Sequence, residues 1–118
     1  MLFVEYPKCT TCIRAKKYLI DNDAKFTSRH IKENNPTRLE LKEWLDKSGL
    51  PIRKLFNTSG LLYKELNLKE KLDLMSEDEK LDLLASNGML VKRPILVDND
   101  KVLFGFKEEE YKKILLGE

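Results

Sequence analysis

The sequence predicts an α/β fold with a mixed β-sheet, in which a helical segment separates two halves of different connectivity. Three observations indicate this fold. A strand, a helix and a second strand follow one another at the start of the chain, and two strands and a helix close it at 94–116. Between them, residues 36–88 carry helical patterns. A βαβ unit favours a parallel strand pair and a tight hairpin an antiparallel one, so the sheet is expected to be mixed.

The first half begins with a short apolar strand at residues 2–5, LFVE. From Thr10 or Thr11 the apolar spacing becomes helical and continues to the polar break at 22–23. The helix is expected to bury one face, made of Cys12, Ala15 and Leu19. Residues 26–31 are predicted to form the second, parallel strand through a right-handed crossover.

Two capping boxes mark helix starts in the middle of the chain, Thr37 with Glu40 and Ser76 with Glu79. The first helix is expected to end at Gly49. Its buried face is predicted to contain Leu41, Trp44 and Leu45.

Shorter helices are predicted at 51–56 and 61–66, on either side of the polar break 57–60. Gly88 is expected to cap the helix that the second capping box begins.

The last segment of the chain is predicted to form an antiparallel hairpin followed by a helix. Strands are predicted at 94–97 and 101–106, joined by the turn 98–100, and the helix at 107–116. The length of 118 residues predicts a single domain, 1–118, with the helical insertion at roughly 36–88.

Composition narrows the function classes. The 22 basic and 20 acidic side chains are nearly balanced, so no one-sided basic patch and no direct nucleic-acid partner are expected. No apolar run reaches the length of a membrane span, and the start MLFVEY lacks the basic region of a signal peptide. We therefore expect a cytoplasmic protein without a membrane partner, whose cysteines are kept reduced.

The two cysteines of the chain, Cys9 and Cys12, lie in the segment YPKCTTC. A structural zinc site needs four ligands, and these two thiols with the lone His30 supply three, so no metal is expected. Two buried, inert thiols remain an alternative. The third interpretation is a redox pair, because a CxxC sequence beside a βαβ pattern is typical of thioredoxin-like redox sites.

The redox interpretation has a physical basis at the helix start. The first sulfur lies beside unpaired backbone N–H groups and the positive end of the helix dipole, which favour thiolate. Cys9 is thus the candidate nucleophile and Cys12 the candidate resolving thiol. Lys8 adds a neighbouring positive charge, and His30 is expected to be structural or exposed rather than a base.

Arg93 and Pro94 form the second half of the candidate site. Pro94 opens a strand, where the missing N–H is tolerated. In thioredoxin-like folds the residue at this point is a cis-proline facing the CxxC pair, although the sequence does not show the isomer. Arg93 is either an ordinary solvated arginine or a group that holds the thiolate or an anion.

The sequence resembles the arsenate reductase (ArsC)/Spx family of thioredoxin-like proteins over nearly the whole chain. The matching segments are YPKCTTCIRAKKYL, NPTRLELKEWLDKSGLP, LFNTSGLLYKELNL, LLASNGMLVKRPILV and VLFGFKEEEY. The resemblance implies a thioredoxin-like (glutaredoxin-like) sheet with a helical insertion, a catalytic Cys9 and a functional Arg93. It also implies that Asn57 and Ser59 lie near Cys9, where they either bind substrate or form a turn and cap.

The family implies three kinds of activity. Some members are arsenate reductases that use glutathione and glutaredoxin, some are uncharacterised reductases, and Spx-type regulators bind the C-terminal domain of the RNA polymerase α subunit. The implied partners are therefore glutaredoxin, thioredoxin or glutathione as reductant, or the polymerase α subunit. No bound cofactor is expected, and glutathione is a candidate co-substrate.

Three departures place the sequence closest to the uncharacterised reductases. Cys12 stands where glutaredoxin-linked arsenate reductases have no cysteine. Those enzymes bind the oxyanion with three arginines, of which Arg93 alone matches here, since Asn57 and a position near Phe106 replace the others. Spx proteins are expected to carry a charged tail beyond the point that corresponds to Glu118. We expect a thiol–disulfide oxidoreductase in which Lys8, Asn57, Ser59 and Pro94 contact the substrate.

Overall fold

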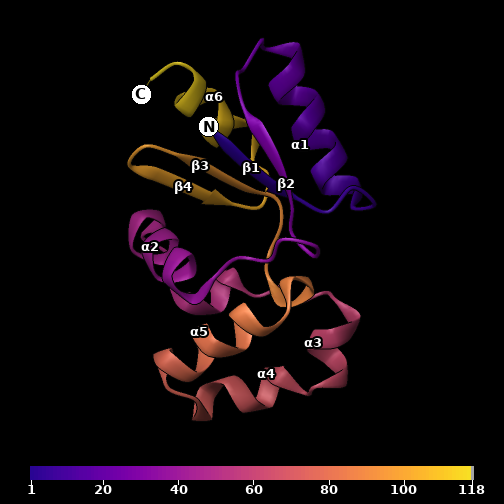
Figure 1. Cartoon of the computed structure of the whole chain (residues 1–118), viewed down its shortest axis with the longest axis vertical. Coiled ribbons are helices and arrows are strands. Elements are labelled where there is room, and N and C mark those ends of the chain that lie inside the picture. Colours follow the sequence, from indigo (N-terminus) through magenta and orange to yellow (C-terminus); the bar gives the residue numbers. More distant parts are fainter. Residues whose placement is uncertain (118) are drawn as a thin grey trace.

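The computed structural model describes residues 1–117, and its centre is a four-stranded mixed sheet with the strand order β2-β1-β3-β4 (Figure 1). β1 (Leu2–Glu5) pairs in parallel with β2 (Thr27–His30) and antiparallel with β3 (Ile95–Asp98). β4 (Lys101–Phe104) continues the sheet as the antiparallel partner of β3. The predicted parallel βαβ unit, the hairpin and the mixed sheet are confirmed.

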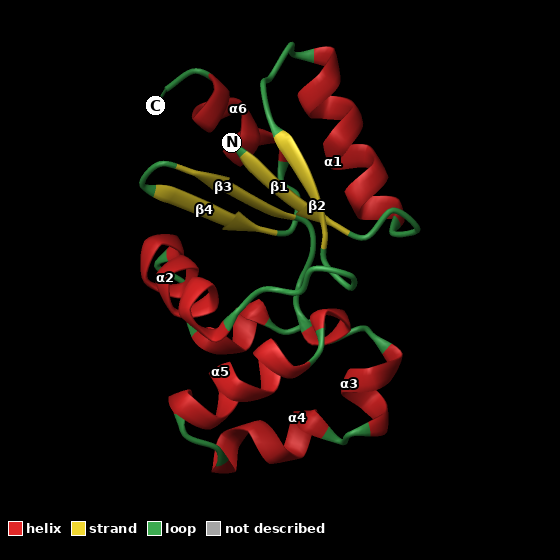
Figure 2. Ribbon diagram, viewed as in Figure 1, coloured by secondary structure: helices red, strands yellow, loops and turns green. Residues whose placement is uncertain are grey.

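Helices α1 (Thr10–Asp21) and α6 (Glu108–Leu115) cover one face of this sheet (Figure 2). Neighbouring residues of a strand point to opposite faces, so Phe3 packs on these helices while Val4 packs on the helical insertion. The core under α1 and α6 consists of Phe3, Ala15, Leu19, Leu96, Tyr111 and Ile114. None of the helices described in residues 1–117 is long and apolar enough to cross a membrane.

The insertion lies on the other face of the sheet and extends away from it (Figure 2). Its α-helices are α2 (Arg38–Ser48), α3 (Leu61–Glu65), α4 (Leu68–Lys71) and α5 (Glu77–Ser86). The 3₁₀ turns η1 (Ile52–Leu55), η2 (Leu72–Leu74) and η3 (Gly88–Leu90) complete it. Leu41, Trp44 and Leu45 of α2 are buried as predicted, and they share one core with Val4, Ile95 and Val102 of the sheet.

Both capping boxes form. The Glu40 N–H donates to Thr37 Oγ1 at 3.1 Å, and the Thr37 N–H donates to Glu40 Oε1 at 3.0 Å. Ser76 and Glu79 repeat this arrangement with the same two lengths. Gly49 ends α2 in the left-handed conformation, with φ 69°.

Gly88 does not cap α5, contrary to the sequence expectation. Asn87 ends that helix, and Gly88 begins the 3₁₀ turn η3 instead. A Cβ atom at Gly88 would lie 1.9 Å from the carbonyl oxygen of Ile31, so this glycine lets the end of the insertion pass directly against the chain leaving β2. A helix-end signal and a close-approach glycine look the same in sequence.

Some predicted strand boundaries differ from the structure. The strands expected at 26–31 and 101–106 are shorter, Thr27–His30 and Lys101–Phe104, and the strand expected at 94–97 is shifted by one residue to Ile95–Asp98. The last strand stops early because Gly105 takes a positive φ of 86°, which turns the chain toward α6.

Candidate active site

Cys9 is the N-cap residue of α1, directly after the loop that leaves β1. Its extended backbone, with φ −84° and ψ 122°, directs the sulfur toward the first turn of the helix. The Cys12 N–H donates a hydrogen bond to Cys9 Sγ, with a nitrogen–sulfur distance of 3.5 Å. The loop itself is held by the Cys9 N–H, which donates to the Tyr6 carbonyl at 2.9 Å.

The surroundings of Cys9 favour its ionised form. Partial burial opposes ionisation, but three groups outweigh it: the backbone N–H of Cys12, the Cys12 thiol and the Arg93 guanidinium. Together they lower the pKa of Cys9 below that of an ordinary thiol. A lowered pKa is the property that a nucleophilic thiol needs at neutral pH.

Cys12 has the opposite environment. Its side chain is fully buried, and this burial, with the neighbouring Cys9 sulfur, raises the pKa of Cys12 to about 12. A backbone hydrogen bond with Tyr6 and the charge of Arg93 act in the other direction but do not compensate. Both cysteines are free thiols here, so the pair consists of one half-buried thiol with a lowered pKa and one buried thiol with a raised pKa.

Arg93 reaches Cys9 from the other half of the fold. The Arg93–Pro94 peptide bond is cis. The guanidinium carbon lies 5.2 Å from the centre of the Tyr6 ring, and Nη1 donates to the Met89 carbonyl at 3.4 Å. Arg93 is thus half-buried and held by other parts of the chain, and its charge favours the thiolate form of Cys9.

A cavity of about 620 Å³ opens in front of Cys9. Among its described lining residues are Lys8, Asn57, Ser59 and Arg93, which the sequence analysis had placed near the sulfur. Asn57 is held by its N–H, which donates to the Leu90 carbonyl at 2.8 Å, and Ser59 Oγ lies 3.4 Å from Asn57 Oδ1. The described lining does not include Pro94 or the buried Cys12.

Sequence reasoning missed three basic residues of this cavity: Arg14, Lys92 and Lys107. Arg14 and Lys107 are both exposed, and both line the cavity. The Arg14 guanidinium carbon lies 5.7 Å from the centre of the Phe106 ring, which is also part of the cavity wall. Their positions in the sequence could have indicated two of these residues. Lys92 is next to Arg93 and Lys107 is next to Phe106, in segments that carry the family resemblance.

The cavity is strongly one-sided in charge. Its described lining contains five basic side chains, Lys8, Arg14, Lys92, Arg93 and Lys107, and no acidic one. Within residues 1–117, none of these five forms an ion pair. The balanced overall composition had predicted no such patch, and that prediction was wrong because net charge says nothing about where charges gather.

His30 and Trp44 take structural positions. His30 Nδ1 accepts hydrogen bonds from the N–H groups of Lys32 and Glu33, each at 3.2 Å. Its ring meets the Tyr6 ring edge-on at 5.7 Å, and it is not among the described lining of the Cys9 cavity. Trp44 is 4% exposed, within the core of the insertion.

The mixed sheet, the CxxC pair at the start of α1 and the cis-proline that opens β3 define a protein of the thioredoxin-like class. The sequence model of the ArsC family matches residues 4–114. The chain therefore belongs to the ArsC family.

Three curated relatives show what this branch of the family contains. The chain is 53% identical to the uncharacterized protein YusI of Bacillus subtilis, over 96% of each chain. It is 36% identical to the regulatory protein MgsR of the same species, over 97% of this chain and 89% of MgsR. It is 28% identical to the global transcriptional regulator Spx of Staphylococcus aureus, over 92% of this chain and 82% of Spx.

Solved structures agree with the fold. An ArsC family related protein from Bacteroides fragilis superimposes with a TM-score of 0.94 and 55% identity, over 96% of this chain and 95% of that one. A structure from Streptococcus mutans, described as a possible arsenate reductase, superimposes with a TM-score of 0.86 and 46% identity, over 94% of this chain and 96% of that one. These similarities confirm the predicted thioredoxin-like fold with its helical insertion.

Proposed function

We propose that this protein is a cytosolic thiol–disulfide oxidoreductase in which Cys9 attacks and Cys12 resolves. The observation that carries the proposal is the contrast between the two thiols: the pKa of Cys9 is lowered beside Arg93, whereas that of the buried Cys12 is raised to about 12. This contrast assigns Cys9 as the nucleophile and Cys12 as the resolving thiol, because a thiolate attacks a disulfide and a protonated thiol does not.

The first step is attack of the Cys9 thiolate on a substrate disulfide, RSSR. A bond forms between Cys9 Sγ and one substrate sulfur, the substrate S–S bond breaks, and RS⁻ leaves. Arg93 stabilises the thiolate before attack and faces the cavity where the substrate's anionic groups would lie. Lys8, Asn57 and Ser59 line the space beside the reacting sulfurs and are the proposed substrate contacts.

The second step depends on a change at Cys12. The Cys9 thiolate is one cause of the high pKa of Cys12. Once Cys9 is a mixed disulfide, that negative charge is gone, so Cys12 ionises more readily than before. Cys12 then attacks Cys9 Sγ, releases the second RS⁻, and leaves its proton to solvent.

One turnover thus moves two electrons from the Cys9–Cys12 dithiol to the substrate, and the protein ends with a Cys9–Cys12 disulfide. Two equivalents of glutathione, or the dithiol of a glutaredoxin or thioredoxin, supply the electrons that restore the thiols. The mechanism needs no resident cofactor, and glutathione enters it as co-substrate or reductant. Pro94 directly precedes β3 and follows Arg93 through the cis peptide bond.

The test is single-turnover reduction of a disulfide by the reduced protein and by Cys9→Ser and Cys12→Ser variants. Wild type should release two equivalents of thiol. Cys12→Ser should release one and retain the other half as a mixed disulfide, visible by mass spectrometry. Full activity in Cys9→Ser would overturn the assignment of the nucleophile.

A second candidate function is a redox-sensing regulator that binds the C-terminal domain of the RNA polymerase α subunit. The observation favouring it is the 36% identity with MgsR, which is named a regulatory protein. In that case the Cys9–Cys12 disulfide is a switch rather than an intermediate. Capture of the α-subunit domain by one redox form only would support it, and absence of binding in either form would exclude it.

Arsenate reduction coupled to glutaredoxin is the third candidate, and the similarity to the S. mutans structure favours it. Arg93 would then meet the oxyanion together with Arg14 and the cavity lysines, because Asn57 and a residue near Phe106 stand at the two other arginine positions of the glutaredoxin-linked enzymes. Arsenate-dependent oxidation of NADPH in a coupled glutaredoxin assay tests this activity. A rate equal to that of Cys9→Ser would exclude it.

A further inference from the structure

A second cavity, of about 360 Å³, adjoins the Cys9 cavity. The insertion supplies one wall, through Arg53, Lys54, Phe56 and Thr58, and β4 and the start of α6 supply the other, through Leu103 and Glu110. The mechanism proposed above uses none of these residues.

The two cavities share a boundary made of Lys92, Phe104 and Lys107, which line both. A ligand held at Cys9 could therefore continue across this boundary without leaving the protein surface. Each cavity has a volume typical of sites for organic small molecules, and an inorganic oxyanion would leave most of this space empty.

The charge of the joined cavities identifies the ligand class. Lys54 adds an exposed cation to the lining of the second cavity and, within residues 1–117, forms no ion pair. Arg53 is partly neutralised by Asp73, and Glu110 is the one acidic side chain in the described lining of the two cavities. Phe56, Val102 and Leu103 supply apolar lining to the second cavity.

We propose that the second cavity is a subsite for the anionic tail of the disulfide substrate. The substrate class is a low-molecular-weight disulfide whose non-reacting part carries two or more carboxylates or phosphates. Its sulfur lies at Cys9, its anionic groups lie against Lys92, Lys107 and Lys54, and its apolar part contacts the apolar lining residues. The inference rests on the proposed oxidoreductase function and narrows its substrate.

The subsite changes no step of the chemistry. The substrate disulfide accepts two electrons from the Cys9–Cys12 dithiol and leaves as two thiols, as described above. The tail contributes binding energy remote from the sulfurs, which positions the scissile bond for attack.

Three disulfides test the proposal: bis(2-hydroxyethyl) disulfide, which is neutral, glutathione disulfide, which carries carboxylates, and coenzyme A disulfide, which carries phosphates. We expect kcat/KM for at least one anionic disulfide to exceed that of the neutral one by roughly tenfold or more at low salt, and this preference to shrink as salt is added. The better of the two anionic disulfides then identifies carboxylate or phosphate as the recognised group.

Charge reversal locates the effect. Lys54→Glu should reduce the anionic-over-neutral preference about tenfold. Thr58→Glu places a negative charge on the same wall and should act in the same direction. The matched control is Lys69→Glu, an exposed lysine of α4 that does not line either cavity. The subsite would be overturned if wild type and the three variants showed the same anionic-over-neutral preference. It would also be overturned if Lys54→Glu and Lys69→Glu reduced that preference equally.

A binding measurement separates this inference from the proposed function. The Cys9→Ser/Cys12→Ser protein cannot react, so calorimetric titration with the two anionic disulfides reports binding alone. Tighter binding to this protein than to the same protein with Lys54→Glu supports the subsite even if no disulfide is turned over. If the neutral disulfide is reduced but neither anionic disulfide binds, the oxidoreductase function stands and the subsite does not exist.

Discussion

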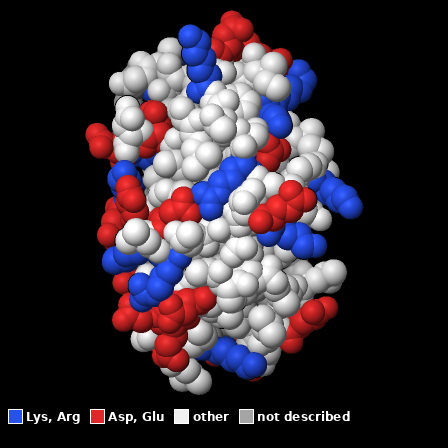
Figure 3. Space-filling view, in the orientation of Figure 1, with Lys and Arg blue, Asp and Glu red and all other residues white. Residues whose placement is uncertain are grey.

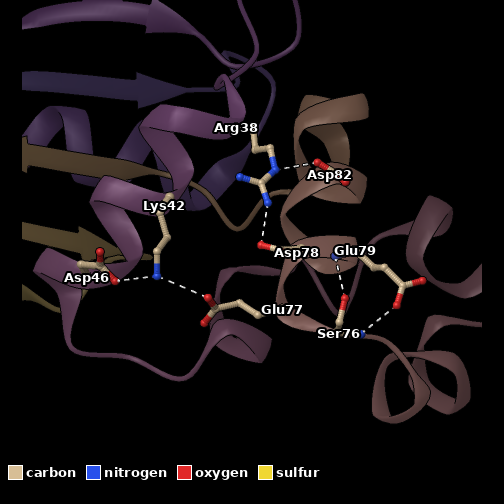
Figure 4. A network of polar contacts seen from close by, with 8 residues as sticks. All are labelled: Arg38, Lys42, Asp46, Ser76, Glu77, Asp78, Glu79 and Asp82. Atoms are coloured by element: carbon tan, nitrogen blue, oxygen red, sulfur yellow. Dashed lines mark hydrogen bonds and ion pairs between the residues drawn. The ribbon is translucent and has the colours of Figure 1, made fainter.

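Basic side chains behave differently in two regions of this molecule, the face between α2 and α5 and the cavity in front of Cys9. Between the helices, Arg38 donates to Asp78 at 2.7 Å and to Asp82 at 2.6 Å (Figure 4). Lys42 lies 3.2 Å from Asp46 and 3.3 Å from Glu77. Acidic and basic groups are interspersed over this part of the surface (Figure 3).

The Cys9 cavity has cations without this compensation. Its five basic side chains have no carboxylate partner within residues 1–117 and face a common space. Like charges held together repel one another, so this arrangement does not serve stability. The cations of α2 are paired with carboxylates of the insertion, whereas the unpaired cations around Cys9 are available to a ligand.

The largest expected effect is loss of reactivity in Cys9→Ser. We expect disulfide reduction to fall by at least about a thousandfold, because a serine hydroxyl is not ionised at neutral pH and does not form a disulfide. The thermal midpoint should change little, since Cys9 is at the surface end of its helix. Thiol release from a disulfide and circular dichroism measure the two quantities, and substantial residual activity would remove Cys9 from the mechanism.

Arg93→Ala and Arg38→Ala test the comparison directly. Arg93→Ala should raise the pKa of Cys9 and slow its alkylation at pH 6–7 by roughly tenfold, because the charge that favours the thiolate is lost. Arg38→Ala should leave the alkylation profile unchanged. The measurement is the rate of alkylation against pH. If the two variants behave alike, Arg93 is not the partner of the thiolate.

The stability of the reduced protein should depend on the ionisation of Cys9. A folded-state pKa lowered below its unfolded value contributes stability that is fully present above the unfolded pKa and is lost as pH falls through the folded pKa. Wild type should therefore lose stability relative to Cys9→Ser as pH is lowered from about 9 through the lowered pKa of Cys9. Urea unfolding over this pH range measures the difference, and a constant difference would contradict a lowered pKa.

In the helical insertion, where the cations of α2 are paired, Ser76→Ala removes one of the two hydrogen bonds of a capping box. We expect a loss of about 1 kcal/mol in the free energy of unfolding, because the Glu79 N–H loses its acceptor. Disulfide reduction should be unaffected, since Ser76 lies in the insertion, outside the described lining of the Cys9 cavity. Urea unfolding and the reductase assay provide the two readouts; a loss of activity at full stability would show that the insertion communicates with the site.

The smallest expected effect is that of Arg38→Gln on stability. The side chain is exposed, so its two ion pairs are screened by water and salt. We expect a decrease in thermal midpoint smaller than that of Ser76→Ala, and one that disappears in high salt. A decrease that persists at high salt would mean that Arg38 stabilises the α2–α5 contact by packing rather than by charge.

Local signals in the sequence predicted the elements well. Thr37 with Glu40 and Ser76 with Glu79 each form a complete capping box, because the partners are three residues apart and the geometry is set within one helical turn. The buried face of α1 followed from helical spacing in the same way. The helix end predicted at Gly88 was wrong, because this glycine is required by the close approach of the Ile31 backbone. The strand predicted to pass Gly105 was too long, because Gly105 takes a positive φ that ends it.

The candidate site was predicted in part. The sequence indicated Cys9, Cys12 and Arg93 through the CxxC spacing and the family resemblance, and the structure brings Arg93 to Cys9. It did not indicate Arg14, Lys92 or Lys107 as neighbours of the sulfur. Their convergence joins α1, the strand-entry segment before β3 and the start of α6, which no local pattern connects.

By itself, the sequence determined the element order, the two capped helices of the insertion, and a thiol at the N-terminus of the first helix, since each depends on residues within a turn or two of one another. The tertiary structure alone decided the cis bond before Pro94 and the gathering of unpaired cations around Cys9. These properties arise where segments far apart in the chain meet, because burial and electrostatic fields depend on distance in space rather than on separation in sequence.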